Sequence, residues 1–286
     1  MRAGVVGLLP RNLGDITTEH ITRLRELGFT GASISLPDPD DVRDADLVHA
    51  RDVLAGGGIR IAQASAAYPA LVHPDATQRA RGVRLVQQAC RAAGIADAVY
   101  LLVRSGSVNL GGNYFPHREN HSQATADRLV ESLRQICSVA EAEGVTLGLE
   151  CHVITTLESP EKVRQIIEAV GSPALRYNAD PVNFVASFRD AYDTAAVLHR
   201  VFDQLAPYVV SAHVKDVCLG DRLVVHINEC APGEGIFDIL TFMQLYEQHH
   251  PDGFALIEHL PDSKIPAAKQ ALDAVLAQAG IPWKQD

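Results

Sequence analysis

The chain alternates short apolar runs with longer amphipathic runs, and the alternation occurs eight times along 286 residues. A strand followed by a helix, repeated in this way, is typical of a parallel sheet covered by its own connections. The predicted strands cover residues 3–8, 31–36, 60–65, 98–104, 145–150, 175–180, 209–214 and 254–258, and the predicted helices cover residues 19–27, 46–55, 77–93, 123–143, 160–170, 193–206, 238–248 and 266–278. Eight repeats favour a closed (β/α)8 TIM barrel of the α/β class over an open sheet.

The glycines that follow the predicted helices agree with this fold. Gly28, Gly94, Gly144 and Gly171 each follow a predicted helix, where glycine commonly ends a helix. The sequence contains no low-complexity tract and no linker, so we expect a single domain over residues 1–286.

Four residues stand at the ends of four predicted strands: Glu150, Asp180, His213 and Glu258. In a parallel barrel every strand opens onto the same face at its carboxyl end, so we expect these side chains to surround one point. Three unpaired carboxylates at one point would raise one another's pKa values, and a divalent cation is the simplest way to keep them ionised. The oxygen-rich ligand set suits Mn²⁺, with Co²⁺ or Mg²⁺ as alternatives.

Composition excludes several classes of partner. The net charge of −10 argues against a nucleic acid or an anionic membrane surface as the partner. No run reaches the ~18 apolar residues of a membrane helix, and the apolar segment 3–10 reads as the first strand rather than a signal peptide. Five cysteines without a Cys-x-x-Cys pair predict reduced thiols in a cytoplasmic protein. Cys151 neighbours Glu150 on a strand, so it should point to the opposite face and pack as a small hydrophobe.

Two connections after predicted strands are long, at residues 105–121 and 215–237. Long loops on the catalytic face of a barrel are often lids or binding loops. The first contains His117, and the second contains the segment 222–226, whose flanking alternation predicts a small hairpin ending near His226. Both histidines are candidate substrate contacts, with a solvated polar loop as the alternative.

Three further polar residues adjoin the predicted strand ends. Arg104 ends the fourth predicted strand, and either points into the pocket or pairs with a neighbouring acid. His152 comes two positions after Glu150, where it either lines the pocket or is a loop histidine. Lys215 comes two positions after His213 on the same side of the strand, so we expect it to offer positive charge to a substrate oxygen rather than to the surface.

Five short motifs occur in order at these positions: Gly-Leu-Glu150-Cys-His152, Asn-Ala-Asp180-Pro-Val-Asn183, Ala-His213-Val-Lys215-Asp216, Pro-Gly-Glu-Gly-Ile-Phe-Asp238 and Leu-Ile-Glu258-His259. Together they resemble the xylose isomerase-like TIM barrels, which include sugar-phosphate isomerases/epimerases and ketose 3-epimerases, over nearly the whole chain. The resemblance implies that Glu150, Asp180, His213 and Glu258 ligate one divalent metal and that Glu150 and Glu258 are the acid/base pair. Asn183 stands where these epimerases often have a substrate-contacting histidine, so the resemblance leaves the sugar open.

The predicted function is therefore a metal-dependent isomerase or epimerase that acts on a ketose or keto-sugar. One glutamate would remove a proton next to the carbonyl, the metal would stabilise the enediolate, and the other glutamate would return a proton. The same enolate could instead expel a β substituent, which would make the protein a dehydratase or a lyase. A catalytically silent sugar-binding barrel is a third reading.

The two long loops resemble a narrower branch of the same barrels. The segment Tyr-Phe-Pro-His117-Arg-Glu-Asn120-His121 and the 222–226 hairpin resemble metal-bearing subunits of enzymes that cleave C-glycosides after oxidation of the sugar. That resemblance implies a lyase acting on a 3-keto-glycoside together with a small partner subunit. The expected partners are thus a small carbohydrate and either further copies of this chain or a second, smaller subunit.

Overall fold

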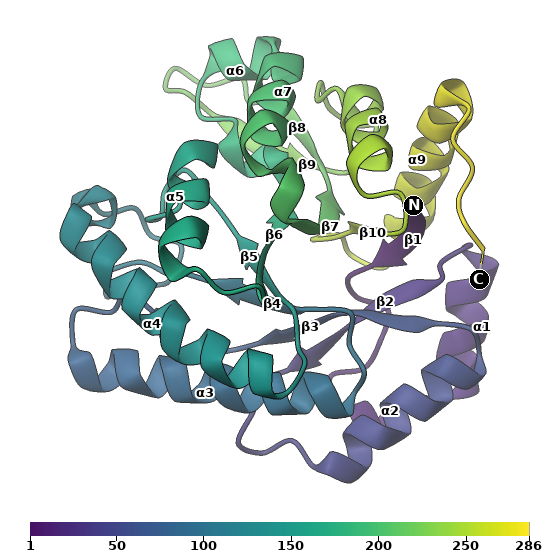
Figure 1. Cartoon of the computed structure of the whole chain (residues 1–286). Coiled ribbons are helices and arrows are strands. Elements are labelled where there is room, and N and C mark those ends of the chain that lie inside the picture. Colours follow the sequence, from purple (N-terminus) through teal and green to yellow (C-terminus); the bar gives the residue numbers. More distant parts are fainter. Residues whose placement is uncertain (286) are drawn as a thin grey trace.

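A computed structural model describes residues 1–285, and its core is a closed barrel of parallel strands surrounded by helices (Figure 1). The strands follow one another around the barrel in the order β1-β10-β7-β6-β5-β4-β3-β2. The barrel strands are β1 (Arg2–Val5), β2 (Gly31–Leu36), β3 (Arg60–Ala66), β4 (Leu101–Arg104), β5 (Leu147–Glu150), β6 (Leu175–Ala179), β7 (Val209–Val214) and β10 (Phe254–Ile257). The predicted single TIM barrel is confirmed.

Helices connect these strands, and most lie where the sequence predicts them. They are α1 (Thr18–Glu26), α2 (Asp44–Gly56), α3 (Ala76–Ile95), α4 (Gln123–Ala142), α5 (Pro160–Val170), α6 (Phe188–Tyr192), α7 (Thr194–Leu205), α8 (Ile239–His249) and α9 (Ile265–Ala279), with 3₁₀ turns η1 (Leu13–Asp15), η2 (Arg118–His121), η3 (Pro181–Phe184) and η4 (Ala206–Tyr208). Predicted segments 31–36, 160–170 and 209–214 match β2, α5 and β7 at both ends. The short helix α6 was not predicted.

The first strand is shorter at its end than the predicted segment 3–8. Gly7 and Leu8 have φ angles of 108° and 66°, which turn the chain out of the extended conformation after β1. Leu8 is buried in the turn as it would be in a strand, so the apolar character of the segment does not show where the strand ends.

Large rings fill the barrel interior where a nearby strand carries glycine. A Cβ atom on Gly31 would lie 2.5 Å from the Phe254 ring, and one on Gly148 would lie 2.4 Å from the Tyr100 ring. Real side chains do not approach so closely, so both positions must stay glycine for these rings to fit.

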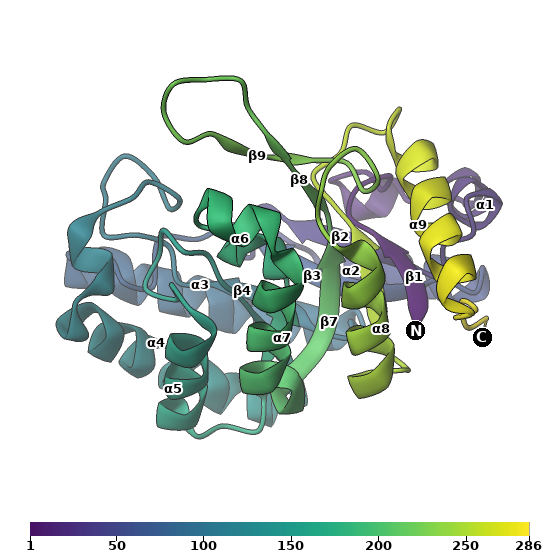
Figure 2. The same ribbon diagram turned by 90° about the horizontal axis from the view of Figure 1, so that it is seen from above.

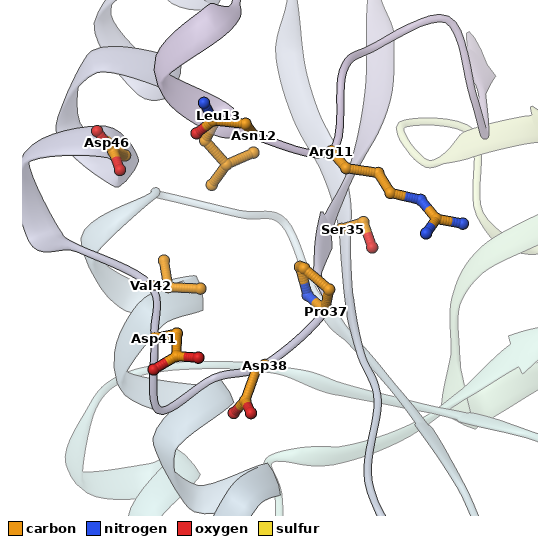
Figure 3. A pocket seen from close by; sticks show the side chains of 9 residues that line it. All are labelled: Arg11, Asn12, Leu13, Ser35, Pro37, Asp38, Asp41, Val42 and Asp46. Atoms are coloured by element: carbon orange, nitrogen blue, oxygen red, sulfur yellow. The ribbon is translucent and has the colours of Figure 1, made fainter.

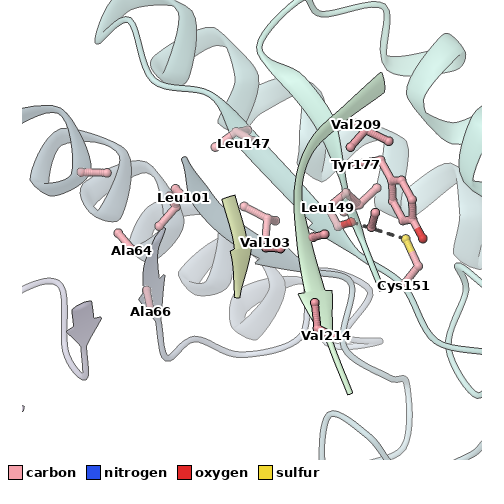
Figure 4. Packing of buried hydrophobic residues seen from close by; sticks show 14 of the residues in the cluster. Ala64, Ala66, Leu101, Val103, Leu147, Leu149, Cys151, Tyr177, Val209 and Val214 are labelled. Atoms are coloured by element: carbon pink, nitrogen blue, oxygen red, sulfur yellow. Dashed lines mark hydrogen bonds between the residues drawn. The ribbon is translucent and has the colours of Figure 1, made fainter. Parts of the chain in front are cut away.

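The outward faces of the strands carry aliphatic side chains that pack beneath the helices (Figure 4). Leu101 and Val103 of β4 pair with Leu147 and Leu149 of β5 in register, and all four are fully buried. Cys151 continues this layer, with its sulfur 3.6 Å from the Leu149 carbonyl oxygen. Its packing role is as predicted, and all five cysteines are free thiols.

A two-stranded antiparallel ribbon, β8 (Asp216–Leu219) and β9 (Ile227–Cys230), stands out from the barrel directly after β7 (Figure 2). The predicted hairpin is therefore present, and the segment 222–226 lies in the loop that connects its two strands. The buried Asp216 carboxylate holds the base of the ribbon, since it accepts hydrogen bonds from the backbone N–H groups of Val217, Gly233, Gly235 and Phe237 at 2.8–3.0 Å. Within residues 1–285, none of the helices combines the length and apolar character that crossing a membrane requires.

Candidate metal centre

Four consecutive strands of the barrel bring the predicted ligand residues together. Glu150 ends β5, Asp180 follows β6, His213 lies in β7 and Glu258 follows β10, and these strands are neighbours in the order β10-β7-β6-β5. One nitrogen or oxygen atom from each residue lies within 4.8 Å of the others. The four residues are between 1% and 4% exposed. The convergence that strand ends predict is thus present in the structure.

The distances within this cluster suit a bound ion. The Nδ1 atom of His213 lies 2.9 Å from Oε2 of Glu258, 3.7 Å from Oε1 of Glu150 and 3.9 Å from Oδ2 of Asp180. Donor atoms bound to one ion at about 2.1 Å are separated by about 3 Å when adjacent and by about 4 Å when opposite.

Within residues 1–285, three atoms of the cluster are buried without a hydrogen-bond partner: Oδ1 of Asp180, Nδ1 of His213 and Oε1 of Glu258. The Lys215 ammonium lies 2.7 Å from the Glu258 oxygen, so Oδ1 of Asp180 and Nδ1 of His213 are the two that remain for an ion. Buried polar atoms are nearly always satisfied in folded proteins. A cation between these two atoms would satisfy both, and the donor set of carboxylates and one imidazole is that of a hard or borderline divalent ion. The residues therefore fit a divalent metal.

The orientation of His213 is fixed by a residue on the opposite side of the barrel. Its Nε2 atom lies 2.7 Å from Oε1 of Gln63 in β3. Gln63 in turn donates from its amide nitrogen to Oγ of Ser33 at 3.2 Å, which identifies Oε1 as the atom facing the imidazole. Because a carbonyl oxygen only accepts, Nε2 carries a proton, so Nδ1 is the atom that would ligate an ion after losing its own proton. The sequence analysis missed Gln63; its signal was a polar residue inside an apolar strand.

Lys215 and Asn183 hold the second oxygen of Asp180. Oδ2 lies 2.8 Å from the Lys215 ammonium and accepts a hydrogen bond of 2.6 Å from the Asn183 amide. The same ammonium lies 2.7 Å from Oε1 of Glu258 and is 1% exposed. Lys215 therefore neutralises two carboxylates at the centre, and Oδ1 of Asp180 is the oxygen left for an ion. A contact of Lys215 or Asn183 with substrate remains a prediction.

Electrostatics at the centre favour cations throughout. Burial lowers the pKa of His213, but Glu258 and Glu150 outweigh that effect and raise its pKa to about 10. Burial raises the pKa of Asp180, and the repulsion of Glu258 adds to this, so that its pKa is about 6 despite Lys215. The pKa of Glu258 is far below its usual range because His213 and Lys215 outweigh the effect of burial. Burial also raises the pKa of Glu150, but its histidine neighbours bring it well below normal.

Arg104 reaches the centre through an aromatic residue of the 105–121 loop. The Arg104 guanidinium donates to the Ala66 carbonyl at 2.8 Å and to the Tyr114 hydroxyl at 3.3 Å. Tyr114 in turn donates to Oε2 of Glu150 at 3.3 Å, and its ring lies edge-on to His152 at 5.1 Å. Tyr114 was not singled out from the sequence, where only its place in a long loop next to Arg104 could have indicated it.

The predicted substrate contacts divide into two groups. His152 lies at the centre, with Nε2 3.8 Å from Oε2 of Glu150 and 3.5 Å from the Asn183 amide nitrogen. His117 instead caps η2, where its Nδ1 accepts the backbone N–H of Glu119 at 3.2 Å. His226 lies in the ribbon loop, and its carbonyl accepts from Gly220 at 2.9 Å. The structure brings neither His117 nor His226 to the cluster, so their contact with substrate remains a prediction.

The ribbon contributes a residue that the sequence analysis missed. Glu229 of β9 lies 3.6 Å from the Lys215 ammonium and 3.0 Å from Nδ1 of His259. His259 directly follows Glu258, and its Nε2 lies 3.7 Å from Oε2 of that glutamate. Glu229 thus links the protruding ribbon to residues that follow β7 and β10.

The comparisons with known proteins agree with the barrel fold. The model of the family described as xylose isomerase-like TIM barrels matches residues 21–278. No curated protein sequence matches the chain. Among solved structures, a D-tagatose 3-epimerase-like protein has a TM-score of 0.74 at 17% identity, covering 98% of each chain.

Two further structures have the same architecture. A xylose isomerase-like TIM barrel protein from Mycobacterium smegmatis in complex with magnesium has a TM-score of 0.72 at 17% identity, covering 96% of this chain and 95% of that one. A 3-keto-D-glucoside 4-epimerase from E. coli has a TM-score of 0.70 at 16% identity, covering 97% and 99%. At such identities these structures show a shared fold, and function rests on the site. From its match over residues 21–278, this chain belongs to the xylose isomerase-like TIM barrel family.

Proposed function

We propose that this protein is a divalent-metal-dependent isomerase or epimerase that acts on a ketose or keto-sugar by proton transfer next to the carbonyl. One observation carries the proposal. Glu150 and Glu258 stand on the two outer strands of the four-strand arc, with Asp180 and His213 on the two strands between them. Two carboxylates on opposite sides of one ligand position can remove a proton from one side and return it from the other.

The ion would be held by Glu150, Asp180, His213 and Glu258, and it would supply Lewis-acid polarisation of the substrate carbonyl. The oxygen-rich donor set supports Mn²⁺, Co²⁺ or Mg²⁺, and the similar protein from Mycobacterium smegmatis is described in complex with magnesium.

The residues of the chain account for the proton transfers. The pKa values of Glu150 and Glu258 lie well below the usual range, so either can be the carboxylate that accepts the proton. The glutamate on the other side must first take a proton from solvent before it can return one to the enediolate. Removal of a proton next to the carbonyl gives an enediolate. Protonation of the same carbon from the other side gives an epimer, and protonation of the neighbouring carbon gives an isomer. Tyr114 and His152 hold Glu150, while Lys215 holds Glu258.

The carbohydrate substrate class is supported by two of the similar structures, which are described as a D-tagatose 3-epimerase-like protein and a 3-keto-D-glucoside 4-epimerase. We also propose that the domain takes in the whole chain. Strand β1 precedes the residues that the family model matches, yet it pairs with both β10 and β2 and so closes the barrel.

Metal analysis followed by solvent exchange tests this function. The Mn²⁺-loaded protein would be incubated with a panel of ketoses and 3-keto-glycosides in D₂O and followed by NMR. We expect one metal ion per chain and deuterium at the carbon next to the carbonyl, with an epimer or isomer as product. Loss of a substituent instead would identify a lyase, and bound metal without exchange on any of these substrates would contradict the proposal.

Two variants separate the catalytic role of Glu258 from a general loss of protein stability. Glu258→Gln should slow the exchange by about 10²–10⁴-fold, because an amide cannot accept the proton. Asp221→Asn, in the exposed loop of the ribbon, should leave the exchange rate unchanged. Equal loss in both variants would point to an unstable protein rather than to catalysis by Glu258.

A further inference from the structure

A cavity of about 440 Å³ lies between the loops that follow β1 and β2 (Figure 3). Both loops leave the carboxyl ends of their strands, which is the face that carries the candidate metal centre. The cavity is lined by Arg11, Asn12, Leu13, Ser35, Pro37, Asp38, Asp41, Val42 and Asp46. None of these residues belongs to the metal centre, so the cavity is a separate space on the same face.

One wall of this cavity is also a wall of the barrel mouth. Ser33 of β2 faces the barrel interior, because its Oγ accepts a hydrogen bond of 3.2 Å from Gln63. The other end of that amide contacts His213 at 2.7 Å. Ser33 therefore lies at the level of the metal-binding imidazole.

Ser35 stands two residues further along the same strand. Alternate residues of a strand share a face, so Ser35 points into the mouth roughly 6–7 Å above Ser33. Because Ser35 also lines the cavity, the cavity adjoins the space just above the metal centre.

The order of strands sets the direction in which a substrate would extend. The candidate ligands occupy β5, β6, β7 and β10, and β10 is followed by β1 and then β2 around the barrel. A molecule whose carbonyl lies at the metal centre can therefore continue over β1 into the cavity. A single sugar ring at the centre would leave the cavity empty.

The lining of the cavity indicates the chemistry of its ligand. The Arg11 guanidinium and the Asp41 carboxylate form no ion pair or side-chain hydrogen bond with any other residue of the described chain, and in Figure 3 Arg11 extends away from Val42 and Asp46. Asp38 uses one oxygen to accept the Asp40 backbone N–H at 3.0 Å. Carboxylates accept hydrogen bonds from hydroxyl groups, and a guanidinium donates to them.

The charge of the cavity favours an uncharged ligand over a phosphate. Asp46 is neutralised by Arg43 at 2.7 Å, so Asp38 and Asp41 remain against the single cation Arg11. A dianionic group would meet a net negative wall. Leucine, proline and valine side chains complete the lining, and such apolar faces suit the C–H surface of a sugar ring.

We propose that this cavity binds the second, uncharged and hydroxyl-rich part of a keto-glycoside whose keto-sugar lies at the metal centre. The inference rests on the proposed function and narrows its substrate class from ketoses in general to unphosphorylated keto-glycosides. The second part would be another sugar ring or a polyhydroxylated aglycone.

The kinetic test compares a short and a long substrate. The Mn²⁺-loaded protein would be assayed by deuterium exchange with 3-keto-glucose and with cellobiose oxidised at C3 of its non-reducing ring. We expect Asp41→Asn and Arg11→Met to raise KM for the disaccharide by about tenfold, the usual effect of one lost hydrogen bond to a charged group, and to leave kcat/KM for the monosaccharide unchanged. Equal effects on both substrates, or no effect on either, would overturn the proposal.

A binding test separates this inference from the proposed reaction. Saturation-transfer NMR would measure unoxidised cellobiose on the same proteins, with Asp221→Asn as the control. We expect binding to wild type and the control, and its loss in Asp41→Asn and Arg11→Met. If no substrate exchanges deuterium, this pattern still supports the cavity as a disaccharide site while the reaction fails. Absence of cellobiose binding to wild type, or tighter binding of glucose 6-phosphate than of cellobiose, would refute the cavity assignment.

Discussion

Two arcs of the barrel interior face each other across its mouth, and they differ in charge. The arc of β5, β6, β7 and β10 carries three buried carboxylates, an imidazole and the Lys215 ammonium. The facing arc of β2 and β3 contributes the neutral side chains of Ser33 and Gln63 to the same network. We infer that the charged arc carries the proposed chemistry, while the neutral arc orients His213 without adding a further charge to the site.

Among changes to the charged arc, a substitution of Glu258 should have the largest effect on the rate of solvent exchange. Glu258→Gln keeps the shape of the side chain but removes a base, so we expect the rate of solvent exchange to fall by about 10²–10⁴-fold. NMR of exchange in D₂O measures this loss. Ser65→Ala removes a polar group from β3 without changing the charged arc and should have little effect; similar losses in both variants would show that the loss is not specific to Glu258.

Removal of the cation in the charged arc should affect stability. Lys215→Met leaves Asp180 and Glu258 without their buried counter-charge, and we expect the free energy of unfolding of the metal-free protein to fall by about 3–5 kcal/mol. Saturating Mn²⁺ should restore part of that loss, because a bound ion compensates the same carboxylates. Urea unfolding with and without metal measures both values.

Lys264 provides the control for this prediction. Its ammonium lies 3.0 Å from Glu234 in a half-exposed pair, so Lys264→Met should cost at most about 1 kcal/mol. A Lys215→Met deficit that is as small, or that Mn²⁺ does not reduce, would mean that the lysine does not compensate the carboxylates of the centre.

The charged arc could be predicted from the sequence and the neutral arc could not. Glu150, Asp180 and Glu258 end apolar runs, and the carboxyl ends of barrel strands meet wherever the strands lie. Gln63 contacts His213 across 150 residues of chain, and this contact exists only because the barrel closes. The strand register also shifts between Ala32 and Ser33 opposite β3, so simple alternation does not tell which β3 residues face inward.

The loops were predictable in position but not in detail. The length of the 105–121 segment predicts a loop over the centre, yet it was Tyr114, not His117, that reached Glu150. The residues between β8 and β9 look like a strand because Val224 and Val225 are β-branched. They are exposed in the loop of the ribbon instead. The base of the ribbon is held by Asp216, whose four backbone hydrogen bonds no periodic pattern encodes.

The neutral arc should matter through metal affinity. Gln63→Leu removes the acceptor that holds the proton on Nε2 of His213, and loss of such an outer partner typically weakens metal binding by about 10–100-fold. Isothermal titration with Mn²⁺ measures this change. Ser33→Ala removes only the hydrogen bond between Gln63 and Ser33 and should weaken Mn²⁺ binding less. An equal or larger effect of Ser33→Ala would show that Gln63 acts through packing.

The smallest expected effect is on the pH dependence of stability. It concerns His250, which contacts the start of β7 and whose pKa shifts in the direction opposite to that of His213. The Nε2 atom of His250 lies 2.8 Å from the Val210 carbonyl, and burial lowers its pKa, so the folded protein holds it neutral. Below pH ~6.5 His250 binds a proton in the unfolded chain but not in the folded protein. The stability that neutral His250 contributes is therefore fully present above that pH and is lost as the pH falls below it.

His250→Gln keeps a donor for the Val210 carbonyl but cannot titrate. We therefore expect the free energy of unfolding of wild type, relative to this variant, to decrease by at most about 1 kcal/mol between pH 7.5 and pH 5.5. Urea unfolding at both pH values measures the difference. An increase in the relative stability of wild type at the lower pH would mean that the folded protein favours the charged imidazole here as it does at His213, and the two ends of the strand would then not differ in the way that the structure implies.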